Sequence, residues 1–172
     1  MRPVPHLTQE AFEAAAQRRL LPLESAVDLD SFQAVWLIHQ AADAARRYLT
    51  ENALADVDLS WTQFEVLWHV WIFGEQEPRC IAGALMQSKS GITAITTYLE
   101  NRGLVRRRGD KSDRRRVHVS VTKKGDALMS RFFPRFNAAE AAFSSKLTIP
   151  QKSQLAELLR ALLADGDPSE QR

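Results

Sequence analysis

Apolar side chains recur at intervals of three and four residues along most of the chain, a spacing typical of helices that bury one face. In the longest such segment, 30–52, Val35, Ile38, Ala42 and Leu49 fall on one side. The pattern predicts helices at about 9–21, 30–52, 61–73, 79–86, 88–102, 123–147 and 149–164.

Residues that begin and end helices stand where this pattern needs them. Ser60 with Gln63, and Thr148 with Gln151, match the capping box, in which two side chains bond the first N–H groups of a helix. Gly103 follows the run that ends near 102, where a left-handed residue stops a helix. The short helix 79–86, a tight turn and the helix 88–102 therefore form a helix-turn-helix arrangement.

The apolar period then changes from 3.6 to 2. A strand begins at Val105, and in VHVSV, residues 117–121, valines alternate with polar residues, which predicts one buried face. A Gly-Asp turn signal lies between the two strands. We therefore expect a β-hairpin, called the wing below. The fold class is mainly α with a small β-hairpin, as a winged helix-turn-helix core with helices added at both ends.

Two further positions carry local expectations. Asp30 is placed to cap the long helix 30–52. Pro134 falls inside the helix 123–147 and predicts a kink or break near 131–134, because proline removes one backbone hydrogen bond and clashes with the preceding turn.

The charge is concentrated in one segment. The chain has 172 residues, 45% of them hydrophobic, and its 23 basic and 21 acidic residues leave a net charge of +2. Residues 102–124 hold ten basic and two acidic residues, a net +8, whereas the rest carries −6. Such a run is either a solvated face or the footprint of a polyanion such as DNA.

Several classes of protein are excluded by composition and motif. One cysteine excludes a disulfide scaffold, and no apolar run reaches the roughly 18 residues of a membrane span. The N-terminus lacks the apolar core of a signal peptide, so we expect a cytoplasmic protein with no membrane partner. The sequence shows no nucleophile elbow, phosphate-binding glycine loop or metal spacing, so we expect no enzyme activity, no cofactor and no metal.

Residues 81–125 resemble the MarR family of bacterial transcription regulators. The family pattern runs from L-A-x-x-L-x-x-S through L-E-x-x-G-L and D-x-x-D-x-R to T-x-x-G. The matching positions are Ile81, Ala82, Leu85, Ser88, Ile92, Leu99, Glu100, Gly103, Leu104, Val105, Arg107, Asp110, Asp113, Arg115, Thr122 and Gly125.

The resemblance implies an obligate homodimer whose first and last helices interlock. Each subunit would place one recognition helix in a major groove of double-stranded DNA and its wing in a minor groove, and a small, often phenolic, ligand or an oxidant would release the DNA. The implied division is an N-terminal helical extension at 1–29, a MarR-like domain at 30–165 and a polar tail at 166–172. Within the MarR-like domain, the winged helix-turn-helix lies at about 60–122, and the dimerisation helices lie at about 30–52 and 123–164.

The candidate DNA contacts lie on the second helix of the motif and on the wing tip. Short hydroxyls and a methyl group can touch base edges, including the thymine methyl, whereas arginine is favoured in narrow minor grooves. On the helix these are Ser88, Lys89, Ser90, Thr93, Ala94 and Thr97, and on the tip Lys111, Asp113, Arg114 and Arg115.

Several of these candidates have a second interpretation. Ser88 is equally suited to be a plain N-cap. Asp113 either orients Arg115, as the resemblance implies, or caps a turn. Arg106 and Arg108 are further candidates for phosphate contact, and Arg107 matches a framework arginine of the family.

An effector pocket is expected where aromatic residues gather. Trp36, His39 and Trp68 combine apolar walls with polar atoms, and Arg46 can supply a cation for an aromatic acid. The alternative for the aromatic residues is ordinary core packing. Cys80 is expected to be a packing residue rather than a redox sensor. Two other functions stay open, an architectural DNA binder and a winged-helix protein-interaction module, each without a ligand response.

Overall fold

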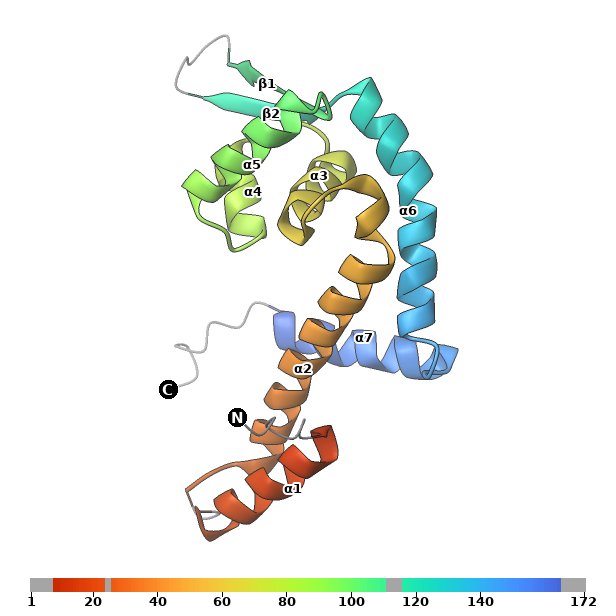
Figure 1. Ribbon diagram of the computed structural model, residues 1–172. Coiled ribbons are helices and arrows are strands. Elements are labelled where there is room, and N and C mark those ends of the chain that lie inside the picture. Colours follow the sequence, from red (N-terminus) through yellow and green to blue (C-terminus); the bar gives the residue numbers. More distant parts are fainter. Residues whose placement is uncertain (1–7, 24–25, 111–115, 165–172) are drawn as a thin grey trace, which may run out of the picture. The chain divides into compact units, whose positions relative to one another are not determined.

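The computed structural model describes residues 8–23, 26–110 and 116–164. The chain divides into two compact units, Met1–Arg47 and Tyr48–Arg172. Its elements are α1 (Gln9–Leu20), η1 (Leu21–Leu23), α2 (Leu29–Asn52), η2 (Leu54–Val57), α3 (Trp61–Phe73), α4 (Pro78–Ala84), α5 (Lys89–Asn101), β1 (Val105–Gly109), β2 (Val117–Val121), α6 (Lys123–Phe143) and α7 (Ile149–Leu163). The expected fold class is confirmed: the chain is mostly helical, with one antiparallel hairpin (Figure 1).

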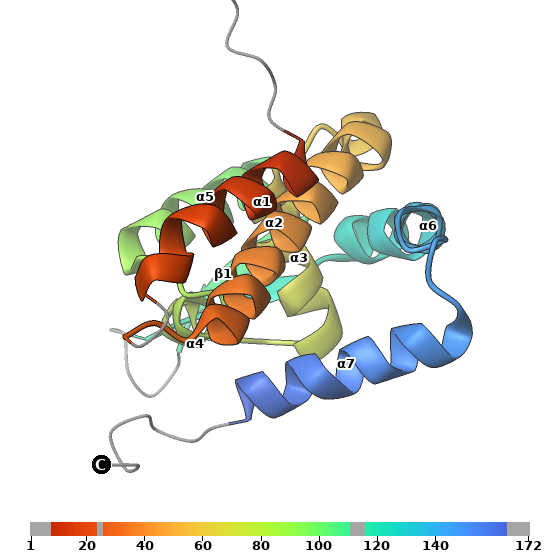
Figure 2. The ribbon, with the colours of Figure 1, turned by 90° about the horizontal axis from the view of Figure 1, so that it is seen from below.

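In the first unit, α1 and the beginning of α2 lie side by side (Figures 1 and 2). The Phe12 ring stacks on the Trp36 ring, with centroids 4.3 Å apart and planes 21° apart. The expected cap of α2 is wrong. Asp28, not Asp30, accepts the Ser31 backbone N–H at 3.0 Å and the Ser31 hydroxyl at 2.6 Å. Asp28 can do so because the helix begins one residue earlier than the pattern predicted.

The sequence-derived caps of the second unit are confirmed. Ser60 accepts the Gln63 backbone N–H at 3.3 Å, and the Gln63 side chain accepts the Ser60 N–H at 2.9 Å. Thr148 and Gln151 form the same reciprocal pair at the start of α7. The short helix η2 was not expected, because four residues are too few to show a period.

Pro134 does not break α6, which is one helix from Lys123 to Phe143 and ends four residues before the expected boundary. The strand β2 has the expected bounds, but its alternation is incomplete, because Ser120 is buried next to Val119. The Arg106 side chain explains this, since its Nε donates to the Ser120 hydroxyl at 2.8 Å and covers it.

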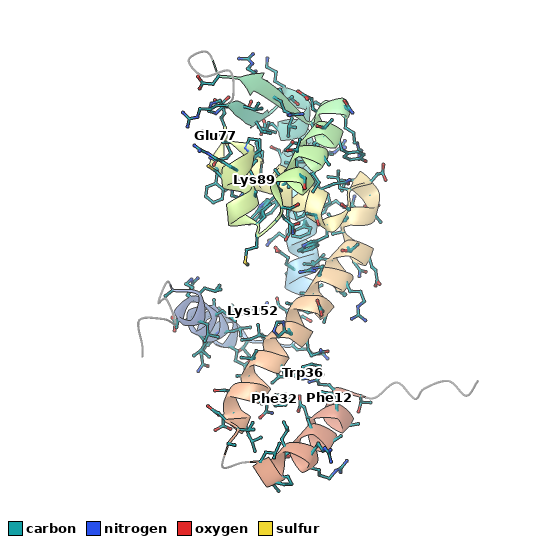
Figure 3. All side chains as sticks on the ribbon, turned by 90° about the vertical axis from the view of Figure 1, so that its left-hand side faces the viewer. Phe12, Phe32, Trp36, Glu77, Lys89 and Lys152 are labelled. Carbon is teal, nitrogen blue, oxygen red and sulfur yellow. The ribbon has the colours of Figure 1, made fainter. Side chains whose placement is uncertain are left out.

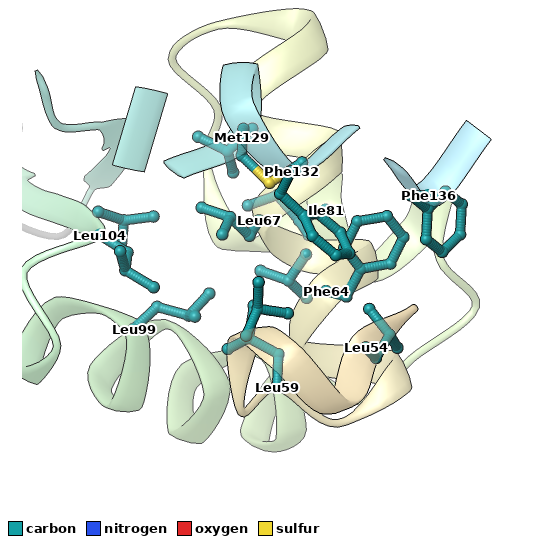
Figure 4. Packing of buried hydrophobic residues seen from close by; sticks show 14 of the residues in the cluster. Leu54, Leu59, Phe64, Leu67, Ile81, Leu99, Leu104, Met129, Phe132 and Phe136 are labelled. Carbon is teal, nitrogen blue, oxygen red and sulfur yellow. The ribbon is translucent and has the colours of Figure 1, made fainter. Parts of the chain in front are cut away.

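The core of the second unit surrounds α3 (Figure 4). Phe64 packs on Phe132 and Phe136 of α6, with ring centroids 5.7 and 4.5 Å away. Ile92 and Leu99 of α5 are completely buried in the same cluster. Burying a side chain of this size stabilises the fold by about 1.5–3 kcal/mol, so the core fixes which face of α5 remains outside.

The junction of α5, the wing and α6 explains two motif positions. Gly103 ends α5 with φ +71°, and the Leu104 N–H bonds the Leu99 carbonyl at 2.9 Å, which completes a Schellman motif. Thr122 donates to the Gly103 carbonyl at 2.6 Å and accepts the Gly125 N–H at 3.0 Å. A Cβ on Gly125 would lie 2.1 Å from the Leu104 oxygen, so only glycine fits this approach.

The wing has a third partner that the pattern did not reveal. Strands β1 and β2 pair antiparallel, with Val105 opposite Val121 and Gly109 opposite Val117. On the other side of β2, Gln76 pairs with Val119 through two backbone hydrogen bonds of 2.9 and 2.8 Å. The connector between α3 and α4 therefore anchors the wing to the helical core.

Candidate DNA-binding surface

The helix α5 has one buried and one open face. Ile92 and Leu99 are completely buried, and so is Thr96, whose hydroxyl donates to the Thr93 carbonyl at 3.1 Å. The opposite face carries the sequence-derived candidates. Ser88, Lys89, Ser90, Thr93 and Ala94 are exposed there, and Thr97 is half-buried. The division follows from helical spacing, whereas the role of these residues in reading DNA stays a prediction.

The hydroxyl groups on this open face are held locally. Ser88 caps α5 by accepting the Gly91 N–H at 3.1 Å. Thr93 donates to the Lys89 carbonyl at 2.9 Å, and Thr97 donates to the Thr93 carbonyl at 2.9 Å. A hydroxyl has two acceptor positions besides its proton, so the exposed Thr93 oxygen remains able to accept a bond from a base or from water.

Arg107 is a framework residue, as its motif position implied. Its Nη1 donates to the Thr97 hydroxyl at 2.8 Å, and its backbone N–H donates to Glu100 Oε1 at 2.8 Å. These bonds fasten β1 to α5. They also mean that Thr97, expected to read bases, has one acceptor position occupied by a wing residue.

The wing-tip candidates Lys111, Asp113, Arg114 and Arg115 lie outside the described residues. Part of the basic segment around them serves the fold instead of a ligand. Arg102 donates to the carbonyls of Asp58 and Val57, and the Lys124 ammonium donates to the Arg102 carbonyl at 2.7 Å. A count of charges in the sequence could not separate these internal contacts from exposed cations.

A groove of about 600 Å³ opens between α4, α5 and β2 and is called the basic groove below. Its polar lining consists of Glu77, Arg79, Lys89, Thr93, Arg107 and Arg116. Figure 3 places Glu77 and Lys89 on neighbouring elements of this part of the chain. Arg79, Arg116 and Glu77 were missed as site residues. Arg116 does belong to the basic run, but nothing in the sequence connects it with residues 77 and 79.

Glu77 joins two of these cations. Its Oε2 lies 2.8 Å from Arg79 Nε, and its Oε1 accepts a hydrogen bond from Arg116 Nη2. Burial raises the pKa of the Glu77 carboxyl, but the hydrogen bond and charge of Arg116 and the charge of Arg79 lower it by more. The net pKa lies below the ordinary value, so the group is a carboxylate at neutral pH.

The candidate effector residues are divided between the two units. Trp36, His39 and Arg46 belong to the first unit and Trp68 to the second. Trp36 lines a pocket of about 470 Å³ between α1 and α2, and its buried indole N–H has no hydrogen-bond partner among the residues that the structure describes. None of the described lining residues is lysine or arginine, whereas Glu10, Glu13 and Asp30 are all present. His39, Arg46 and Trp68 are exposed.

The expected packing role of Cys80 is wrong, because its side chain is exposed. The helix α4 buries Ile81 and Ala82. Successive residues are about 100° apart around a helix, so Cys80 falls outside the buried sector.

Comparison with known proteins agrees with this geometry. Residues 59–117, from the start of α3 through the wing, match the MarR family model. Residues 59–117 therefore form a MarR-family domain. This family consists of DNA-binding transcriptional regulators rather than enzymes.

Relatives and a solved structure support the assignment. The chain is 27% identical over 154 residues to the uncharacterised HTH-type transcriptional regulator YwaE of Bacillus subtilis, covering 90% of both proteins. It is 33% identical over 95 residues to the transcriptional repressor MprA of Escherichia coli, covering 55% of this chain and 54% of MprA. A mutant MarR from E. coli complexed with operator DNA shares the fold, with a TM-score of 0.70, 24% identity and coverage of 80% and 99%.

Within the described residues, no helix is long and apolar enough to cross a membrane.

Proposed function

We propose that this MarR-family regulator represses transcription by binding a pseudo-palindromic operator as a homodimer, and that a small aromatic ligand releases it. The observation that carries the DNA-binding part is the open face of α5 beside the basic groove. The face presents short hydroxyls and the Ala94 methyl, and the groove next to it carries arginine and lysine. Short polar groups suit base edges, and the cations suit phosphates.

The exposed leucines of α7 support the homodimer. No residue of α7 is buried against the described part of the chain. Leu158 and Leu162 are 59% and 67% exposed. Because monomeric proteins rarely expose a continuous apolar stripe, we propose that a second copy covers this face through a two-fold interface. Two recognition helices related by this symmetry would bind half-sites about one turn of DNA apart.

The individual contacts are part of the proposal. Ser90, Thr93 and Ala94 touch base edges, whereas Ser88 and Lys89 meet phosphates at the start of the helix. On the wing, Arg114, Arg115 and Lys111 enter the minor groove, and Asp113 orients Arg115. Thr97 contributes through its position beside Arg107.

The proposed effector is a neutral aromatic molecule such as a phenol. The pocket beside Trp36 offers aromatic surface from Trp36 and Phe32, together with three carboxylates. These carboxylates repel an aromatic acid, so we no longer propose an acid whose carboxylate is held by Arg46 or His39. A phenol fits better, because its hydroxyl can donate a hydrogen bond to a carboxylate. Trp68 of the second unit is proposed as a separate aromatic contact.

A salt titration tests DNA binding. Fluorescence anisotropy with a duplex selected by the full-length protein from a random pool should show affinity falling steeply as salt rises, with one counterion released per phosphate contact. Binding that is independent of salt would instead favour the protein-interaction module.

A ligand titration tests release. Phenol and salicylate are added to the DNA complex while tryptophan fluorescence is followed, and Trp36→Phe serves as the control. Release by phenol that is weakened in this variant supports the proposal. Continued binding in the presence of both compounds favours the architectural DNA binder.

A further inference from the structure

The short connector between α3 and α4 is fastened to the wing at two consecutive residues. Gln76 forms the paired backbone hydrogen bonds with Val119, and Glu77 accepts the hydrogen bond from Arg116. Val119 lies in β2, and Arg116 is the residue immediately before that strand, so the two contacts are three residues apart. They tie the position of the wing to the start of α4 without using the wing tip.

Glu77 is well placed to hold cations rather than to serve the helix. It stands at the N-cap of α4 but makes no side-chain capping bond. Its side chain is only 13% exposed, whereas those of its partners Arg79 and Arg116 are 62% and 45% exposed. One carboxylate therefore orders two long side chains that still reach solvent within the basic groove.

We infer that Glu77 is a positioning residue for operator recognition. By holding Arg116 of the wing and Arg79 of α4 on one carboxylate, it sets the spacing of two phosphate-binding cations relative to α5. The order gained in advance lowers the entropic cost of binding, because each long side chain immobilised at an interface carries such a cost. This inference rests on the proposed binding of DNA through α5 and the basic groove.

The sign of the effect separates this role from simple electrostatics. A carboxylate on a surface that meets phosphates repels them, so its removal should strengthen binding to every duplex equally if charge were its only contribution. A positioning role predicts the opposite for the correct operator. Without Glu77 the general attraction to DNA persists, but the preference for the operator decreases.

The test compares Glu77→Gln with Glu75→Gln in the full-length protein. Glu75 is two residues earlier on the same connector, and its removal deletes the same charge. Its carboxylate lies 3.9 Å from His118 Nδ1 and bridges no pair of arginines in the described structure. The probes are the duplex that the unmodified protein selects from a random pool and a scrambled duplex of equal length, both at about 150 mM salt.

The expected result is a smaller ratio of the two affinities in Glu77→Gln. The ratio should fall about fivefold to tenfold, the scale of the net contribution of one ordinary hydrogen bond. Glu75→Gln should change it less than about twofold, within the scale of an exposed ion pair. Arg116→Ala should show the same loss, and adding Glu77→Gln to that variant should reduce the ratio little further, because the two residues act through one contact.

Hydrogen exchange provides a readout that needs no DNA. In Glu77→Gln the amides of β2 should exchange faster than in the unmodified protein and in Glu75→Gln, while far-ultraviolet circular dichroism remains unchanged. Equal strengthening of both duplexes, or an unchanged ratio, overturns the inference. If the unmodified protein selects no duplex, the proposed function fails, and unchanged exchange in β2 then separately contradicts the positioning role.

Discussion

The helices α5 and α7 have similar lengths and both follow an amphipathic pattern, yet their apolar faces have different surroundings. In α5, Ile92 and Leu99 are completely buried, and the helix packs against α3, α4 and the wing. In α7, Leu158 and Leu162 are mostly exposed in the single chain. The pattern marks a face that needs covering, but it does not say whether the same chain or a second one covers it.

The largest expected effect concerns α7. Leu158→Glu combined with Leu162→Glu should dissociate the proposed homodimer, because burial of each leucine contributes about 1.5–3 kcal/mol and a dimer would contain four. Unpaired charges in the interface add a further cost. Light scattering would measure the loss, with Ser153→Glu on the same helix as the control. If the double variant remained dimeric, α7 would not form the interface.

The matching change in α5 should affect folding rather than assembly. Leu99→Ala leaves a cavity in the core cluster to which Leu99 belongs, and such substitutions cost about 2–5 kcal/mol. Urea unfolding would measure the free energy of unfolding. The corresponding substitution, Leu158→Ala, is measured in a chain that also carries Leu162→Glu to prevent dimerisation. It should cost well under about 1 kcal/mol, a surface-scale effect. Equal costs at both positions would contradict the contrast between the helices.

Acidification should lower the stability of the second unit through His69. Burial lowers the pKa of this imidazole, which packs 4.7 Å from the Phe73 ring. The unfolded chain therefore binds a proton more readily than the folded one, and stability falls as pH drops below the unfolded value of about 6.5. Urea unfolding at pH 7.5 and 5.5 should show this loss, and His69→Gln should reduce it. A loss of equal size in the variant would assign the effect to other groups.

The smallest effect concerns the turn between α4 and α5. Met86 has φ +49° and is almost fully exposed, so the chain places a residue with a side chain in the left-handed region. Met86→Gly should relieve strain of about 1 kcal/mol, partly offset by the greater freedom of glycine in the unfolded chain. A small rise in melting temperature is expected, and Gln87→Gly, at a neighbouring exposed position, should lower it instead.

Much of the local structure followed from the sequence. The capping boxes at Ser60 and Thr148 and the stop at Gly103 depend on bonds between residues at most a few positions apart. The bounds of β2 followed from the two-residue period of its side chains. The open face of α5 followed from its spacing in the same way. The cap of α2 was misplaced by two residues because Asp28 and Asp30 both fit the pattern, and only the backbone geometry chooses between them.

The chemistry of the basic groove required the tertiary structure. Glu77 and Arg116 are 39 residues apart, and their contact depends on how the connector and β2 meet. The same holds for Arg102, whose basic side chain binds the carbonyls that end η2. Charge in the sequence marked this region as either a solvated face or a surface for a polyanion, but it did not indicate which cations remain accessible.

By itself the sequence determined the elements, their order, the family and the faces that must be covered, because caps, turns and amphipathic spacing act within a few residues. Only the tertiary structure decided which apolar faces the chain covers itself, which arginines belong to the framework, and that a carboxylate holds two cations beside α5. These features depend on contacts between distant segments, whose positions follow from packing of the whole core.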